Sequence, residues 1–287
     1  TFTSSHWLLA WMGLEINTLA ILPLMAQHHH PRAIEASIKY FLAQATAAAT
    51  ILFASTINAW STGEWNIYCL THPAATTLIM MALALKVGLA PMHFWMPPVM
   101  QGLDLPTGLI MATWQKLAPF ALIIQMAPTA PPLLLTTLGL TSVLVGGWGG
   151  LNQTQLRKIL AYSSIAHLGW MIIILQFKPQ LTLLTLTLYV FMTSATFLTF
   201  KMMATTKINT LATSWAKAPT ITAAATLALL SLGGLPPLTG FMPKWLILQE
   251  LSTQNLPLTA TIMALSALLS LYFYLRLCYA MALTTAP

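Results

Sequence analysis

The sequence predicts an all-α polytopic membrane protein of about nine transmembrane helices, and three observations support this class. Hydrophobic residues make up 57% of the 287 residues and charged residues only 6%, whereas soluble globular proteins carry about 25% charged residues. The apolar runs reach the length of about 20 residues that a spanning helix needs. These runs are too long for barrel strands, and a span must satisfy its own backbone hydrogen bonds, so the spans are helices.

Polar or proline-rich turns separate the apolar runs. The histidine run in the first turn has no second ligand cluster, so it predicts no metal site. Asp104 precedes the fourth span, where negative charge suits the helix dipole. Glycines at the end of the fifth span allow a neighbouring helix to approach closely. The spans are expected at residues 6–26, 36–59, 71–98, 107–126, 133–151, 157–175, 181–203, 220–250 and 257–283, with the histidines at His28, His29 and His30 and the glycines at Gly146, Gly147, Gly149 and Gly150.

Two of the spans carry the same interruption. Residues 88–97 (GLAPMHFWMP) align without gaps on residues 234–243 (GLPPLTGFMP), and about half of the aligned positions are identical. A proline inside a helix costs about 3 kcal/mol, and paired interrupted segments in matching places indicate a transport site built on broken helices. The alternative is two proline-kinked helices that only pack. The helix-breaking residues are Gly88, Pro91 and Pro97 in the first segment and Gly234, Pro236, Pro237 and Pro243 in the second.

Five ionisable residues lie within the spans: Glu15, Lys86, Lys116, His167 and Lys244. The four charges among them would cost on the order of 10 kcal/mol if isolated in lipid, so they must face one another, polar groups or water. We predict a hydrophilic axis that loads and releases protons, with histidine as a relay because it titrates near neutrality. Plainer alternatives stay open: Glu15 pairing with a neighbouring subunit, Lys116 in a packing ion pair, and His167 as a satisfied core histidine.

The sequence argues against other chemistry. The net charge of +7 is scattered and forms no basic stripe for nucleic acid; most basic residues fall on one predicted face, as the positive-inside rule requires. Ser163, Ser164 and His167 lack an orienting acid, so no hydrolase is predicted. Spacings for a dinucleotide, haem or iron–sulfur cluster are absent from the sequence, so we expect no redox centre, bound cofactor or metal in this chain.

Four segments carry a family resemblance: LLAWMGLEINTLAILPLM, LKVGLAPMHFWMP, LRKILAYSSIAHLGWM and LLSLGGLPPLTGFMPKW. They resemble the antiporter-like membrane-arm subunits of NADH:ubiquinone oxidoreductase (respiratory complex I) of vertebrate mitochondria, and the resemblance covers essentially the whole chain. It implies a single antiporter-like domain over residues 1–287, with two inverted five-helix repeats at about 1–126 and 130–283. Family members have one more span before the first residue and a last helix after Pro287, so a truncated chain with an incomplete first repeat is expected.

The resemblance implies a non-redox subunit of a proton-translocating enzyme in the mitochondrial inner membrane, driven by NADH oxidation and ubiquinone reduction in other subunits. Glu15 and Lys86 would form the gating pair, Lys116 and His167 the relays, and Lys244 the exchange site. NADH, FMN, iron–sulfur clusters and ubiquinone would bind elsewhere in the complex. Expected partners are the small adjacent core subunit, the next antiporter-like subunit, accessory subunits, and lipids including cardiolipin. A stand-alone cation/proton antiporter and a structural spacer of the membrane arm remain alternatives.

Overall fold

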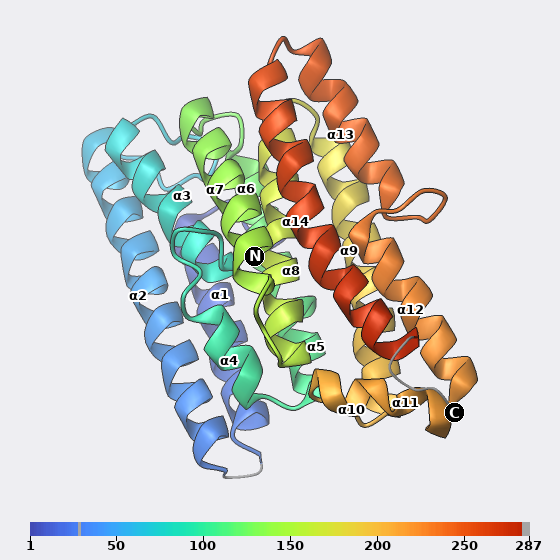
Figure 1. Ribbon diagram of the computed structural model, residues 1–287. Helices are drawn as coiled ribbons and strands as arrows, with labels where there is room; N and C mark the ends of the chain where they lie inside the picture. The colour runs from blue at the N-terminus through green and yellow to red at the C-terminus, as the bar shows by residue number, and fades with distance from the viewer. Residues whose placement is uncertain (28–29, 283–287) are drawn as a thin grey trace. The chain divides into compact units, whose positions relative to one another are not determined.

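The computed structural model describes residues 1–27 and 30–282. His28 and His29 of the histidine run, and Leu283 at the expected end of the last span, lie outside the described residues. The chain forms two compact units, Thr1–Thr137 and Leu138–Pro287, here named the first and second units. The labelled helices are shown in Figure 1.

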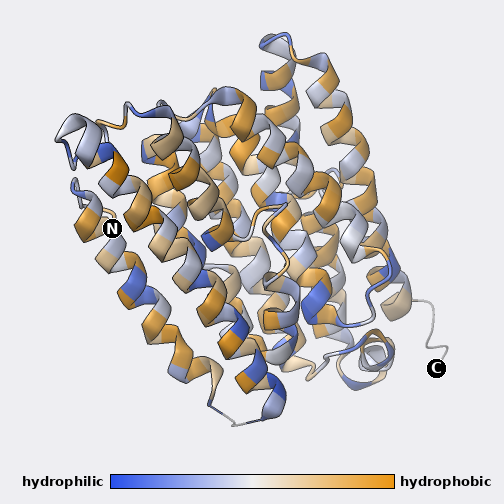
Figure 2. Ribbon diagram, turned by 90° about the vertical axis from the view of Figure 1, so that its left-hand side faces the viewer, coloured by the Kyte–Doolittle hydropathy of each residue, from blue (hydrophilic) through white to orange (hydrophobic). Residues whose placement is uncertain are grey.

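Among the described residues, seven helices are long and apolar enough to cross a membrane, when α5 and α6 are taken together. Two shorter apolar helices, α3 (Pro73–Val87) and α12 (Pro219–Gly233), each continue after an interruption, into α4 (Met96–Gly102) and α13 (Phe241–Thr253). Seven and two give nine apolar segments. Figure 2 shows hydrophobic residues along the helices, interrupted by single hydrophilic positions. The predicted all-α class with two discontinuous helices is confirmed.

In the first unit, α2 (Pro31–Thr62) packs against α1 (Trp7–Met25), α3 and α4. The helix is longer than the predicted span because both of its ends are well capped. Proline at its first position fits helix initiation, and the Nδ1 atom of His30 accepts a hydrogen bond from the backbone N–H of Arg32 at 3.2 Å. Gly63 ends the helix with a φ of 74°, a left-handed conformation that favours glycine.

The fourth span is interrupted, which the sequence did not predict. It consists of α5 (Leu105–Ala112), preceded by Asp104 as expected, and α6 (Trp114–Met126). Between them Thr113 has φ −115° and ψ −71°, and its hydroxyl donates to the carbonyl of Leu109 at 2.8 Å. Pro119, inside α6, has no N–H to donate to the preceding turn. The helix is therefore irregular on both sides of Lys116.

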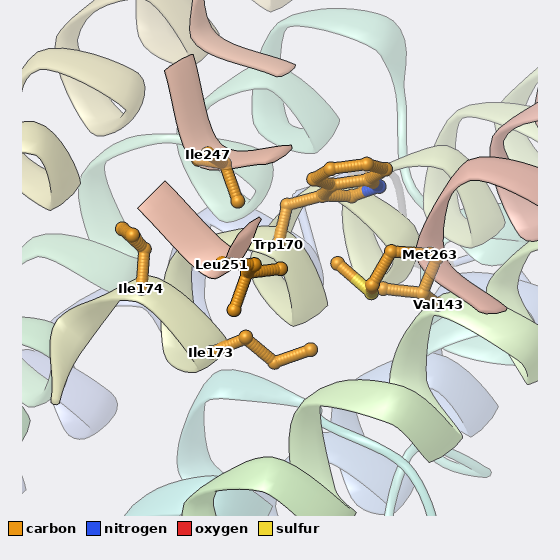
Figure 3. Close-up of a cluster of buried hydrophobic side chains, with 7 residues drawn as sticks. All are labelled: Val143, Trp170, Ile173, Ile174, Ile247, Leu251 and Met263. Carbon is orange, nitrogen blue, oxygen red and sulfur yellow. The ribbon is translucent and has the colours of Figure 1, made fainter. Parts of the chain in front are cut away.

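In the second unit, α12 packs against α9 (Pro179–Met202) and α14 (Pro257–Ala282), and α8 (Leu156–Leu175) contacts α9, α13 and α14. A hydrophobic cluster joins α8 to α13 and α14 (Figure 3). The cluster consists of Val143, Trp170, Ile173, Ile174, Ile247, Leu251 and Met263.

The polar connection after α9 holds two short helices, α10 (Ile208–Ala212) and α11 (Ser214–Lys217). These helices are too short to give a periodic sequence signal.

The glycines of α7 (Pro132–Gly150) have the predicted packing role. A Cβ atom on Gly146 would lie 2.6 Å from the backbone nitrogen of Ala166 in α8, and one on Gly150 would lie 2.8 Å from the ring of Phe273 in α14. Both distances are too short for a side chain. The expected close approach of neighbouring helices is confirmed within the second unit.

The broken helices recur at a fixed interval. Helix α3 begins at Pro73 and α12 at Pro219, and 219 − 73 = 146; the helices end at Val87 and Gly233, and 233 − 87 = 146. Gly88 and Gly234 follow with φ of 87° and 80°, and cis peptide bonds precede Pro91 and Pro237. Pro97 and Pro243 lie in the first turns of α4 and α13, where proline is tolerated. The repeat boundaries at about 1–126 and 130–283 stay a prediction.

Candidate functional site

The break in the first unit exposes helix-end carbonyls that side chains then satisfy. The last carbonyls of a helix have no partner within it. At the end of α3, the indole N–H of Trp95 donates to the carbonyl of Leu85 at 2.9 Å. The amide of Gln44, from α2, donates to the carbonyl of Lys86 at 3.2 Å. These bonds fix the backbone that carries Lys86.

The side chain of Lys86 is buried, with 5% of its surface exposed. Its Nζ atom makes no hydrogen bond with any described residue, and the same holds for Oε2 of Glu15. Glu15 is the charged group that acts electrostatically on Lys86. The two opposite charges thus interact without a direct hydrogen bond, which is the arrangement in which an intervening water is to be expected.

A small cavity lies beside Lys86 within the first unit. Its volume is about 10 Å³, which is room for about one water molecule. Lys116, with 3% of its surface exposed, also lines this cavity. The amide of Asn17 donates to Oε1 of Gln115 at 2.6 Å and so ties α1 to α6 along its wall. The polar residues of the lining are Asn17, Thr18, Tyr40, Gln44, Lys86, Gln115 and Lys116.

In the second unit Lys244 lies directly on the second break. Its Nζ atom donates to the carbonyl of Gly233, the last residue of α12, at 2.8 Å. A Cβ atom on Gly234 would lie 2.9 Å from this Nζ, so the lysine occupies the space that a side chain would need. A cation at a helix C-terminus is favoured by the helix dipole. Lys244 is half-buried. Like Trp95 at the first break, it donates a side-chain hydrogen bond to a helix-end carbonyl.

The hydrogen bonding of His167 determines its tautomer. Its Nδ1 atom lies 2.7 Å from the backbone carbonyl of Ser163, one turn earlier in α8. Because a carbonyl can only accept, Nδ1 carries the proton and Nε2 is the nitrogen that gains or loses one. The imidazole is half-buried, and its ring centroid lies 5.6 Å from that of Tyr189 in α9.

The structure therefore brings Glu15, Lys86 and Lys116 together in the first unit, and places His167 and Lys244 in the second. Sequence reasoning missed the polar residues around them. Asn17 and Gln115 could have been noticed as amides next to predicted relay residues in apolar spans. The tyrosines among them could not have been singled out from the sequence, because tyrosine is also common at membrane interfaces. The missed residues are Asn17, Tyr40, Gln44 and Gln115 in the first unit and Tyr189 and Tyr274 in the second.

Two matched broken helices with a lysine beside each define a membrane protein of the transporter type. Residues 4–270 match the family model described as "NADH:quinone oxidoreductase/Mrp antiporter, TM", and the chain belongs to this family. The resemblance that the four sequence motifs carry is confirmed.

Individual relatives agree with this family. The NADH-ubiquinone oxidoreductase chain 2 of Formosania lacustris is 77% identical over 287 residues, covering 100% of this chain and 82% of that protein. A chain of respiratory complex I from Thermus thermophilus matches with a TM-score of 0.91 and 33% identity, over 99% of this chain and 68% of that one. A chain of the Mrp complex from Dietzia sp. DQ12-45-1b, 18% identical, shares the fold with a TM-score of 0.87, over 99% and 58%.

Proposed function

We propose that this chain is a membrane-arm subunit of NADH:ubiquinone oxidoreductase that takes part in proton translocation across the mitochondrial inner membrane. One observation carries the proposal: Lys86 and Lys116 line the same one-water cavity, and the charge of Glu15 acts on Lys86. Family membership and the high identity to a relative named NADH-ubiquinone oxidoreductase chain 2 support the assignment to this enzyme.

In the proposed mechanism Glu15 controls the charge of Lys86. A buried ammonium is costly unless an opposite charge is near, so Lys86 holds its proton while the Glu15 carboxylate is ionised and close. When that negative charge is neutralised or withdrawn, the proton leaves through the cavity water to the neutral amine of Lys116. His167 is the next relay and Lys244 the exchange site. Each proton moved against the membrane potential costs about 2.3 kcal/mol per 100 mV, which the redox reaction must supply.

The chain itself holds no redox cofactor in this proposal. NADH, FMN, the iron–sulfur clusters and ubiquinone are bound by other subunits of the complex. The small adjacent core subunit and the next antiporter-like subunit are the proposed neighbours within the membrane, together with accessory subunits and lipids including cardiolipin.

The test is the Lys86→Met variant in the assembled complex. Methionine keeps much of the length of lysine but cannot carry a proton, so the number of protons pumped per NADH oxidised should fall severalfold. Lys39→Met is the matched control, because Lys39 is exposed and paired with Glu35 on the surface of the same unit; exposed pairs contribute about 0–1 kcal/mol.

Unchanged pumping by an assembled Lys86→Met complex would contradict the proposal and favour the structural spacer. Cation/proton exchange by the isolated chain in proteoliposomes, without redox partners, would instead favour the stand-alone antiporter.

A further inference from the structure

A cluster of buried hydroxyl groups lies near His167 in the second unit, and the proposed mechanism does not use it. Tyr189 of α9 and Tyr274 of α14 are fully enclosed, with exposures of 1% and 0%. Ser163 and Ser164 of α8 are also buried, each with 1% of its surface exposed. Four hydroxyls buried this deeply are costly unless each is hydrogen-bonded or has another role.

The first tyrosine connects to His167. The rings of Tyr189 and His167 are 5.6 Å apart between centroids, and Tyr189 is hydrogen-bonded to the side chain of Ser164. Ser164 already donates its own hydroxyl proton to the carbonyl of Ala161 at 2.7 Å. The phenol of Tyr189 is therefore the donor in its bond to Ser164.

The second tyrosine connects this cluster to the helix break. The hydroxyl of Tyr274 lies within reach of Ser163 and interacts electrostatically with Tyr189. The other end of the same side chain packs on Gly233: a Cβ atom there would lie 3.6 Å from Cδ2 of Tyr274. Because Lys244 donates to the carbonyl of Gly233, Tyr274 and Lys244 contact the same residue.

The hydroxyl of Tyr274 stands out within the cluster because it makes no hydrogen bond of normal geometry with any described residue. A buried, unsatisfied hydroxyl costs about 1–3 kcal/mol, and such a group in a native structure calls for a functional or hydration explanation. A structural role would not explain it, because phenylalanine would fill the same space without this penalty.

We propose that Tyr189 and Tyr274, with Ser163 and Ser164, are relay residues that pass a proton between His167 and the helix break at Lys244. This inference rests on the proposed function and extends it. The imidazolium releases its Nε2 proton, and each hydroxyl oxygen accepts one proton and gives up its own. The serine hydroxyls must turn away from the carbonyls of Leu160 and Ala161 to do so. Water at the break passes the last proton to the neutral amine of Lys244. The hydroxyls end unchanged, and one positive charge has moved from His167 to Lys244.

The decisive variant is Tyr274→Phe in the assembled complex, measured by protons pumped per NADH oxidised and by the solvent deuterium isotope effect on pumping. We expect the pumping rate to fall at least about tenfold, less than the 10²–10⁴-fold typical of a direct proton donor because water replaces part of the path. The isotope effect should change, and the thermal stability should not fall. Tyr272→Phe is the matched control, since Tyr272 lies on the same helix with 59% of its surface exposed.

The Lys86→Met variant, measured in parallel, separates the two proposals. Reduced pumping in Lys86→Met with normal pumping and an unchanged isotope effect in Tyr274→Phe would overturn the tyrosine relay alone. Normal pumping in both variants would overturn the proposed function together with the relay. A fall in Tyr274→Phe accompanied by an equal fall in Tyr272→Phe would also overturn the relay, because the loss would then not be specific to the buried hydroxyl.

Discussion

At the scale of single residues, the proposed function depends on the charge of Glu15 in the first unit. It acts on the buried Lys86 without a direct hydrogen bond, so its influence is electrostatic and extends through a region of low dielectric constant. An interaction of this kind is sensitive to charge and insensitive to shape. Substitution by an amide of the same size therefore isolates the charge.

We expect Glu15→Gln to assemble normally and to lower the number of protons pumped per NADH severalfold. The variant removes the negative charge that stabilises the protonated form of Lys86 in the protein interior. The measurement is proton uptake during NADH oxidation by the assembled complex. Glu35→Gln is the control, since Glu35 is exposed and pairs with Lys39 on the surface. Wild-type pumping in Glu15→Gln would show that the carboxylate has only a packing role.

The sequence predicted the charged residues of the proposed relay but not the polar residues that lie near them. A lysine or glutamate in a span is conspicuous because its cost in lipid is high. Asn17, Gln115 and Tyr274 cost far less and are compatible with several roles. Their function depends on which helices meet, such as α1 and α6 at the Asn17–Gln115 bond, and one sequence read alone does not contain that pairing.

At the scale of helices, side chains of different types hydrogen-bond to the helix-end carbonyls at the two breaks. At each break the helix-end carbonyls lack the N–H groups of a continuing helix. The neutral indole of Trp95 satisfies Leu85 in the first unit, whereas the ammonium of Lys244 satisfies Gly233 in the second. The second break thus places a titratable group where the first has a permanently neutral donor, so the strength of the hydrogen bond at the second break depends on the charge of Lys244.

Gly234→Ala tests this coupling between backbone and lysine. Alanine at a φ of 80° costs about 1–2 kcal/mol, and its Cβ would also lie 2.9 Å from Nζ of Lys244 and displace it from the carbonyl of Gly233. We expect lower thermal stability of the complex and reduced pumping.

Gly63→Ala is the matched control, because Gly63 also has a positive φ, 74°, but nothing within 4 Å of its Cβ position. It should show the backbone cost without the loss of pumping. If both variants pump equally well, the contact between Gly234 and Lys244 has no role in transport.

The breaks themselves could be predicted because glycine and proline act locally and appear at matching places in the sequence. The interruption at Thr113 could not, since threonine is common within helices and its irregular φ of −115° leaves no mark in the sequence. The short helices α10 and α11 were missed for a related reason. Segments of five and four residues show no hydrophobic period to detect.

At the scale of the whole molecule, the chain consists of two units in which the same broken helix recurs 146 residues later, as 234 − 88 and 237 − 91 both show. The repeated alignment in the sequence was enough to predict this duplication. The same alignment also places the two lysines on opposite sides of their breaks, and the structure agrees: Lys86 lies in α3, before the first break, and Lys244 lies in α13, after the second. The duplicated helices therefore carry their lysines at non-equivalent positions.

The proposed relay includes Lys86 of the first unit and Lys244 of the second, and it makes a specific prediction about combined variants. Substitutions of residues that act together in one function have strongly non-additive effects. Once Lys86→Met has interrupted the path, a second interruption at Lys244 therefore causes no further loss of pumping. We expect Lys86→Met, Lys244→Met and the double variant to pump at similar, reduced levels in the assembled complex, measured as protons per NADH. If each unit instead translocated protons independently, the two single variants would each retain part of the pumping and the double variant would fall well below both.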